Sequence, residues 1–379
     1  MQGKGIFIPG KRDPNTRART GQVILPHGRV PTPAFMPVGT NATVKAISVQ
    51  DLEEIGFPII LANTYHLMLR PGEELIRDSG GLHGFTGWRR NFLTDSGGFQ
   101  IFSLAPFRKL SDEGAQFRSH IDGSVRFLSP EKAVEIQTAF NSDIQMQLDV
   151  CTPWGTPENE VKRALWLTSN WAGRAKKRWL EERDEGYEGS LFGIIQGGFS
   201  HELRTQSAAE ILSLDLPGVA VGGLSVGEPA EVYAEQLAFV GGLLPDDRPH
   251  YLMGIGTPDY ILEAVENGID LFDCVFPTRI ARNGLLFTEK GPLSIKKAEF
   301  EKDFLPIDPE CGCKVCAHYS RAYLHHLYKN QEILYSMLGT YHNLYFLHNF
   351  VRRVRNSIEA GTFEAFKHEF LSTYKQRLD

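Results

Sequence analysis

The stretch that decides the fold runs LFGIIQGG at residues 191–198, GVAVGGLS at 218–225, HYLMGIG at 250–256 and LFDCVF at 271–276. Each segment is a short apolar run that ends in polar or glycine residues. Between successive runs, the spacing of apolar residues changes to that of a helix. Buried strands that alternate with helices are typical of a parallel sheet.

Four earlier runs extend the pattern toward the N-terminus: PAFMPV at 33–38, IILANTY at 59–65, NFLTDSGG at 91–98 and DIQMQLD at 143–149. Ser129, Thr156 and Thr257 each precede a proline and an acid, which predicts three helix N-caps. Eight strand–helix units in roughly 250 residues predict an α/β fold, a (β/α)8 TIM barrel. An open doubly wound sheet is the alternative, although its GxGxxG fingerprint is missing.

We expect the other segments to belong to the same unit as the barrel, so that residues 1–379 form a single catalytic domain. Residues 1–32 predict a strand or hairpin preceding the barrel, with its turn at 26–28. Residues 279–345 break the alternation, carry a cysteine cluster and predict an inserted zinc-binding subdomain. Helical stretches at 346–360 and 362–377 are expected to close the chain over 346–379.

Composition limits the classes of function. With 40 basic and 46 acidic residues the net charge is −6, so nucleic acid could bind only at a local basic patch. Five cysteines, an odd number, argue against a disulfide framework and favour a reducing compartment. The N-terminus lacks a signal-peptide pattern and no apolar run approaches eighteen residues, so we expect a cytoplasmic protein without a membrane segment.

The cysteine cluster predicts a metal site. Cys311, Cys313 and Cys316, followed after twenty-five residues by His342, supply the Cys3His set that closes a tetrahedral Zn2+ shell. Four protein ligands leave no open position, so the ion is expected to be structural. Spacing alone leaves the histidine open, because four others lie nearby: His318, His325, His326 and His348.

Three aspartates lie within or at the end of predicted strands: Asp95, Asp149 and Asp273. Strand ends of a barrel converge on one mouth, where such carboxylates are either catalytic or merely capping and paired. Two carboxylates at one mouth can perform glycosyl transfer, one at the anomeric carbon and one moving protons. A third carboxylate and the amide of Gln196 could instead recognise a polar ring such as a purine.

Basic residues cluster just after Asp273. Between Arg279 and Lys302, six basic residues face three glutamates, which gives 6 − 3 = +3 and predicts a phosphate-binding rim. Two further clusters, at residues 11–19 and 352–355, could be either nucleic-acid contacts or ordinary solvated surface.

Taken together, the motifs DSGGFQ, GIIQGG, VGGLSVGE, HYLMGIGTP and DLFDCVFPTRIAR, with the cysteine spacing, resemble the tRNA-guanine transglycosylase family along nearly the whole chain. The resemblance implies a (β/α)8 barrel with a zinc-binding insertion. The implied reaction exchanges guanine at the wobble position of tRNAs with GUN anticodons for a 7-deazaguanine base.

The resemblance also implies roles for matching positions. Asp273 would be the nucleophile that bonds to ribose C1′, and Asp95 the general acid/base. The implied base-recognition set is Asp149, Gln196, Gly223 and Leu224, with Phe99 and Met253 sandwiching the ring. Anticodon-loop contacts would come from Lys45, Arg279 and Arg282. The implied zinc ligands are Cys311, Cys313, Cys316 and His342.

Cys151 and Val226 are similar to the residues of bacterial members, which take the small aminomethyl base rather than queuine. The family further implies a homodimer, with Leu67, Tyr319, Tyr323 and His326 at contact positions. Competing expectations are a queuine-using enzyme, a non-catalytic tRNA-binding subunit of the same fold, and a small-molecule zinc hydrolase. The filled Cys3His set argues against the last of these.

Overall fold

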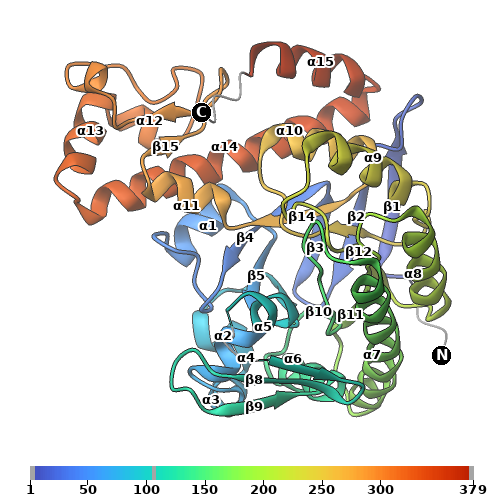
Figure 1. Cartoon of the computed structure of the whole chain (residues 1–379). Helices are drawn as coiled ribbons and strands as arrows, with labels where there is room; N and C mark the ends of the chain where they lie inside the picture. The colour runs from blue at the N-terminus through green and yellow to red at the C-terminus, as the bar shows by residue number, and fades with distance from the viewer. Residues whose placement is uncertain (1–4, 105–107, 375–379) are drawn as a thin grey trace.

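The computed structural model describes residues 5–104 and 108–374, and at its centre is a closed barrel of eight parallel strands surrounded by helices (Figure 1). All eight predicted runs form strands of this barrel, so the open-sheet alternative is wrong. Pairing of β14 with β4 closes the barrel. The strands are β4 (Ala34–Gly39), β5 (Ile59–Asn63), β6 (Asn91–Asp95), β10 (Ile144–Met146), β11 (Ser190–Ile195), β12 (Gly218–Val221), β13 (His250–Leu252) and β14 (Leu271–Cys274).

Helices follow the strands on the outside of the barrel (Figure 1). They are α1 (Val49–Ile55), α2 (Thr64–Leu69), α3 (Glu73–Asp78), α4 (Gly81–Thr86), α5 (Gly98–Leu104), α6 (Pro130–Ala139), α7 (Glu158–Asp184), α8 (His201–Ser213), α9 (Ala230–Gly241), α10 (Pro258–Glu266) and α11 (Phe276–Arg282).

Two of the three predicted N-cap positions are confirmed, and one is wrong. The hydroxyl of Ser129 accepts from the Lys132 amide at the start of α6. Thr257 occupies the N-cap position of α10 without a side-chain hydrogen bond. Thr156 is not a cap, because α7 begins one residue later and the Thr156 hydroxyl donates instead to the Pro153 carbonyl at 2.8 Å.

The N-terminal residues form a three-stranded antiparallel sheet, one strand more than the expected hairpin: β1 (Phe7–Arg12), β2 (Arg19–Leu25) and β3 (Gly28–Thr32). The turn between β2 and β3 lies at the expected place. Phe7, Val23 and Val30 are buried in the same apolar cluster as Met36 and Leu93 of the barrel strands. The sheet therefore covers one end of the barrel and leaves the other end free.

A second antiparallel sheet, which the sequence analysis did not predict, lies between α5 and α6. It consists of β7 (Arg108–Ser111), β8 (Gly114–Arg118) and β9 (Val125–Leu128). Ala115 and Phe117 are buried, whereas Val125 and Phe127 are exposed. The irregular alternation explains why the pattern was missed, although glycines at 114 and 123 mark the turns.

The segment after α11 contains short elements and two closing helices: β15 (Leu285–Leu286), β16 (Leu293–Ser294), η1 (Ala298–Phe300), α12 (Lys314–His318), α13 (Arg321–Lys329), α14 (Ile333–Ala360) and α15 (Phe363–Thr373). The expected helix at 346–360 is wrong at its start, since α14 begins at Ile333. Figure 1 shows α12, α13 and β15 gathered around one end of α14, with α15 over the other end. The domain boundaries at 279 and 345 stay a prediction. Among the described residues, no helix combines the length and apolar character needed to cross a membrane.

Candidate active site

Asp273 lies in β14, at the end of the barrel away from the N-terminal sheet, and its Oδ1 atom accepts two hydrogen bonds. The Tyr251 hydroxyl donates to it at 2.6 Å, and the Gly254 amide donates at 2.9 Å. Tyr251 comes from the neighbouring strand β13, and Gly254 follows that strand with a φ of 82°. Burial raises the pKa of Asp273, while both hydrogen bonds oppose that rise by stabilising the ionised form.

Asp95 is the last residue of β6 and stands directly beside Asn63, the last residue of β5, in the parallel register. The Asn63 side-chain amide donates to Oδ2 of Asp95 at 2.7 Å, and the Gly97 amide donates to Oδ1 at 2.8 Å. Burial raises the pKa of Asp95 to about 7, and the charges of Asp273 and Asp149 add to the rise. Near neutral pH this carboxyl group can therefore both donate and accept a proton.

Asp149 is 8% exposed and follows β10, and Gln196 follows β11. The Gln196 amide nitrogen donates to Oδ2 of Asp149 at 2.6 Å, while its own Oε1 is buried without a hydrogen-bond partner among the described residues. Burial raises the pKa of Asp149 to about 6, against the hydrogen bond from Gln196. An unpartnered buried acceptor is costly unless a ligand completes it.

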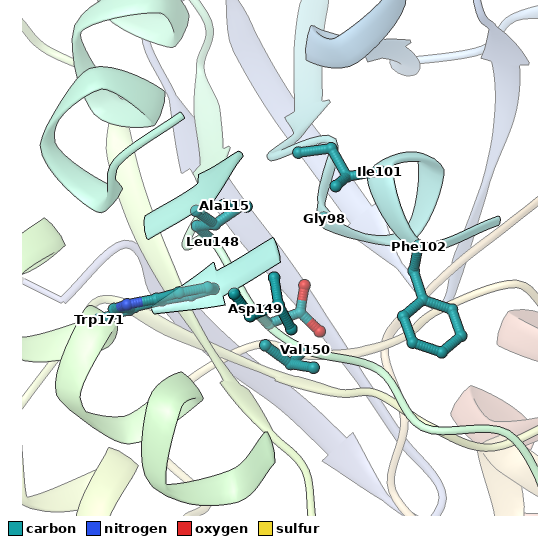
Figure 2. Close-up of a pocket in the computed structure, with 9 residues that line it drawn as sticks. Gly98, Ile101, Phe102, Ala115, Leu148, Asp149, Val150 and Trp171 are labelled. Atoms are coloured by element: carbon teal, nitrogen blue, oxygen red, sulfur yellow. The ribbon is translucent and has the colours of Figure 1, made fainter. Parts of the chain in front are cut away.

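Figure 2 shows the Asp149 carboxylate in a pocket beside Gly98 of α5. A β-carbon at Gly98 would lie 2.6 Å from the Asp149 carbonyl oxygen and 2.9 Å from its Oδ1, so only glycine permits this approach. The pocket encloses a cavity of about 10 Å³, room for roughly one water molecule. Helix α5 is thus held tightly against the carboxylate.

The remaining predicted base-site residues lie on the loops that follow the same strands. Phe99 is 50% exposed near the start of α5, whereas Cys151 and Leu224 are buried. Met253 follows β13 and packs against the barrel's inner apolar cluster. Val226 lies in the loop after β12, where its amide donates to Glu228 Oε2 at 2.8 Å.

The predicted rim of basic residues is present beside Asp273. Arg279 and Arg282 lie one turn apart on α11, which follows β14 directly; Arg279 and Lys45 are exposed. None of the three has a carboxylate within 4.0 Å in the described ranges, so their charges are available. The other clusters are tied into the fold, as Arg19 pairs with Asp270 and Arg353 with Glu289.

The three predicted cysteines and His342 come together, with all four ligand atoms within 4.8 Å of one another. The Nδ1 atom of His342 lies 3.4 Å from the sulfurs of Cys313 and Cys316 and 3.9 Å from that of Cys311. Tetrahedral bonds to sulfur and nitrogen place such atoms about 3.5 Å apart. The other ring nitrogen contacts the Phe287 carbonyl at 2.7 Å and so fixes the ring. This cluster forms a potential metal-binding site.

Sequence reasoning missed three residues that organise the mouth. Tyr251 binds Asp273, Glu228 accepts hydrogen bonds from the Ser225 and Val226 amides, and Arg204 is buried beneath the loops after β11 and β12. Arg204 could have been found, because it shares the buried face of α8 with Ser207 and Ile211. A charged residue on a buried helix face signals a structural or functional partner. Tyr251 and Glu228 gave no comparable signal.

Fold and site together define a barrel enzyme that carries buried carboxylates at its mouth and a Cys3His cluster that could hold a metal ion. The family model described as queuine tRNA-ribosyltransferase matches residues 13–376. A relative of that name from Treponema denticola is 57% identical over 376 residues, covering 99% of each chain. A relative of the same name from Caldanaerobacter subterraneus is 50% identical over 364 residues, covering 96% of each chain. Another, from Desulforudis audaxviator, is 51% identical over 367 residues, covering 97% of this chain and 98% of the relative.

The chain therefore belongs to the queuine tRNA-ribosyltransferase family. This confirms the family resemblance found in the sequence motifs, and it makes the protein a transferase of the pentosyltransferase class.

Proposed function

We propose that this enzyme exchanges the wobble guanine of tRNAs with GUN anticodons, those for aspartate, asparagine, histidine and tyrosine, for 7-aminomethyl-7-deazaguanine. One observation carries the proposal. Two carboxylates share the barrel mouth in different environments: Asp95 has its pKa raised to about 7, and Asp273 has one oxygen held by two donors. The raised pKa suits Asp95 as a proton carrier, and the oriented carboxylate suits Asp273 as a nucleophile.

In the first step, a carboxylate oxygen of Asp273 attacks C1′ of the ribose and the bond from C1′ to guanine N9 breaks. Protonated Asp95 gives its proton to the departing guanine, so the base leaves neutral. The products are a ribosyl ester of Asp273, ionised Asp95 and free guanine. Proton transfer of this kind contributes about 10²- to 10⁴-fold in rate.

In the second step, the incoming deazaguanine loses its N9 proton to ionised Asp95, and N9 attacks C1′ from the face that guanine left. The ester bond to Asp273 breaks and both carboxyl groups return to their starting states. Two inversions give net retention, as in retaining glycosidases.

Base recognition is proposed for the polar groups around Asp149. A guanine-like ring offers adjacent N–H donors and a carbonyl acceptor, and the unpartnered Oε1 of Gln196 matches one such donor. Backbone amides near Gly223 and Leu224 would meet the carbonyl. Phe99 and Met253 would stack on the two faces of the ring.

The aminomethyl base rather than queuine is proposed because Cys151 and Val226 are the residues expected in members of the family that take the smaller base. Both polar groups of the Val226 backbone form hydrogen bonds. Its amide donates to Glu228, and its carbonyl accepts from the Trp154 amide at 3.4 Å. With the backbone held there, the bulk of the Val226 side chain would exclude the cyclopentenediol of queuine. A queuine-using enzyme is the alternative.

Lys45, Arg279 and Arg282 are proposed to bind anticodon-loop phosphates, because all three carry unpaired charge beside the mouth. A homodimer in the cytoplasm is proposed for the working enzyme. Its contact positions include Tyr319 and Tyr323, whose rings stack at 5.7 Å, and His326.

Cys311, Cys313, Cys316 and His342 are proposed to hold one structural Zn2+ ion. Three thiolates with one imidazole form a soft, closed donor set, which favours zinc over magnesium or calcium. The ion would supply folding free energy to the segment around α12 and take no part in the reaction.

The purified chain should incorporate labelled guanine into a GUN-anticodon tRNA and not into the same tRNA with adenine at the wobble position. Incorporation of the aminomethyl base should exceed that of queuine when both are offered side by side. An Asp122→Asn variant, altered in an exposed turn, should incorporate base at the wild-type rate. If the purified chain alone fails to incorporate any base, it is a non-catalytic subunit and the proposal is wrong.

A further inference from the structure

Arg204 is a completely buried cation behind the barrel mouth. It lies in α8 with 0% exposure, and its guanidinium group has no carboxylate within 4.0 Å among the residues that the structure describes. It binds backbone carbonyl oxygens instead. Its Nε donates to Gly198 at 2.8 Å, one terminal nitrogen donates to Gly222 at 2.7 Å and Ile195 at 3.2 Å, and the other donates to Gly223 at 3.1 Å.

Burying this cation without a carboxylate partner costs free energy, which indicates that Arg204 has a specific role. An unpaired guanidinium loses its hydration on burial, and burial lowers the pKa of Arg204 to about 10. The group still remains charged at neutral pH. A neutral amide or hydroxyl could satisfy one or two carbonyls at lower cost. Only arginine has a rigid fork of five donors that can reach carbonyls of two separate loops at once.

By binding these carbonyls, Arg204 also fixes the direction of the N–H groups in the same peptides. In a trans peptide, the C=O and the following N–H point in opposite directions. Because the carbonyls of Gly222 and Gly223 face Arg204, the amides of Gly223 and Leu224 face away from it. A charge-assisted hydrogen bond to the carbonyl also polarises the peptide, which strengthens the N–H as a donor.

The neighbouring side chain is held by the same packing. A β-carbon at Gly222 would lie 2.5 Å from the Gln196 amide nitrogen, and one at Gly223 would lie 2.7 Å from Gln196 Oε1. Gln196 and the loop after β12 therefore fit against each other with no space between them. Arg204 connects this loop to the Gly198 loop after β11, so both sides of the base site share one anchor.

We propose that Arg204 is a positioning residue for base recognition, which fixes and polarises the Gly223 and Leu224 amides without touching the base. The inference rests on the proposed function, because it assigns those amides to the heterocycle. It predicts that binding of the free base depends on Arg204, while binding of a tRNA with adenine at the wobble position does not.

The test compares Arg204→Lys with Arg19→Lys. Arg19 is a matched control, since it is also buried but pairs with Asp270, which directly precedes β14 at the opposite end of the barrel. Guanine affinity is measured by calorimetry, tRNA affinity by anisotropy, and Tm by thermal unfolding. Arg204→Lys should weaken guanine binding about tenfold or more, which corresponds to roughly one lost hydrogen bond. Its affinity for the tRNA with adenine at the wobble position should stay within about twofold. Arg19→Lys should lower Tm and leave guanine affinity unchanged.

Unchanged guanine affinity in Arg204→Lys, with Tm lowered as in Arg19→Lys, would show a merely structural role and overturn the inference. If Arg204→Lys does not fold, backbone amide order parameters of the wild-type protein decide. Rigid amides at Gly223 and Leu224 before base is added support the inference, and flexible amides that become rigid only with guanine overturn it. Guanine binding without any exchange into tRNA would instead refute the proposed function and leave the role of Arg204 standing.

Discussion

The Tyr251 hydroxyl donates to Oδ1 of Asp273 at 2.6 Å, and Oδ1 also accepts the hydrogen bond from the Gly254 amide. Both donors act on one oxygen, so the other carboxylate oxygen is the one available for attack on a sugar. Tyr251 is 1% exposed, which fixes its ring and hence the rotamer of Asp273. Residues on and just after the neighbouring strand thus orient the carboxylate and favour its ionised form against the effect of burial.

Replacing Tyr251 by phenylalanine should lower kcat about tenfold or more, because a hydrogen bond to a charged group is lost. The hydrogen bond lowers the pKa of Asp273, so its loss should raise that pKa and shift the acid limb of the pH–rate profile to higher pH. Tyr233→Phe is the control, since the buried Tyr233 hydroxyl has no partner among the described residues. An unshifted acid limb in Tyr251→Phe would contradict this role.

Asp95→Asn should reduce base exchange by about 10²- to 10⁴-fold, because the proposed proton carrier is removed. It should also change how stability depends on pH. The pKa of Asp95 is raised to about 7 in the folded protein, so the wild type loses stability as pH rises from about 4 to 7. The Tm difference, variant minus wild type, should therefore increase between pH 5 and pH 8. A constant difference would show that the pKa of Asp95 is not raised.

The ion pair of His27 and Asp143 should stabilise the protein mainly under mildly acidic conditions. The side-chain hydrogen bond from His27 to Asp143, 2.7 Å long, raises the pKa of His27. Burial raises the pKa of Asp143, but its hydrogen bonds outweigh burial and lower it overall. The pair therefore contributes fully above about pH 4 and below about pH 6.5, and its contribution fades as pH rises through the folded pKa of His27.

His27→Gln should accordingly cost more stability at pH 5.5 than at pH 8.5, measured by urea unfolding. His368→Gln, altered at an exposed histidine that has no ion pair among the described residues, should show no such difference. Equal losses for His27→Gln at both pH values would mean that the charge of His27 does not hold the N-terminal sheet to the barrel.

Cys313→Ser should remove the metal and loosen the segment around α12. Metal analysis of the wild type should find about one zinc per chain, and the variant should bind far less. Limited proteolysis should then cut within residues 287–330 while the barrel persists. Cys151→Ser, altered far from the cluster, should keep its zinc. Full zinc content in Cys313→Ser would contradict the ligand assignment.

Much of the fold could be predicted because buried parallel strands appear as short apolar runs of their own, such as IILAN in β5. The metal cluster was predictable for a similar reason, since three ligands lie within six residues. The family resemblance, not the spacing, selected His342, and the structure brings it to the cysteines.

Other features depend on contacts between distant segments and were not predictable. The hydrogen bond from Tyr251 to Asp273 requires the register of β13 against β14, and the hydrogen bonds of Arg204 require two loops to meet. The start of α14 at Ile333 was missed because its first turns carry exposed apolar residues, Ile333 and Met337, which hide the amphipathic pattern.

The central claim is that Asp273 forms a covalent ester with the ribose. The most direct measurement mixes the enzyme with labelled GUN-anticodon tRNA, denatures the mixture, and maps any RNA adduct by mass spectrometry. We predict a ribosyl adduct on the peptide that contains Asp273, and neither adduct nor base exchange in Asp273→Asn. An adduct on another residue, or wild-type exchange by Asp273→Asn, would contradict the claim.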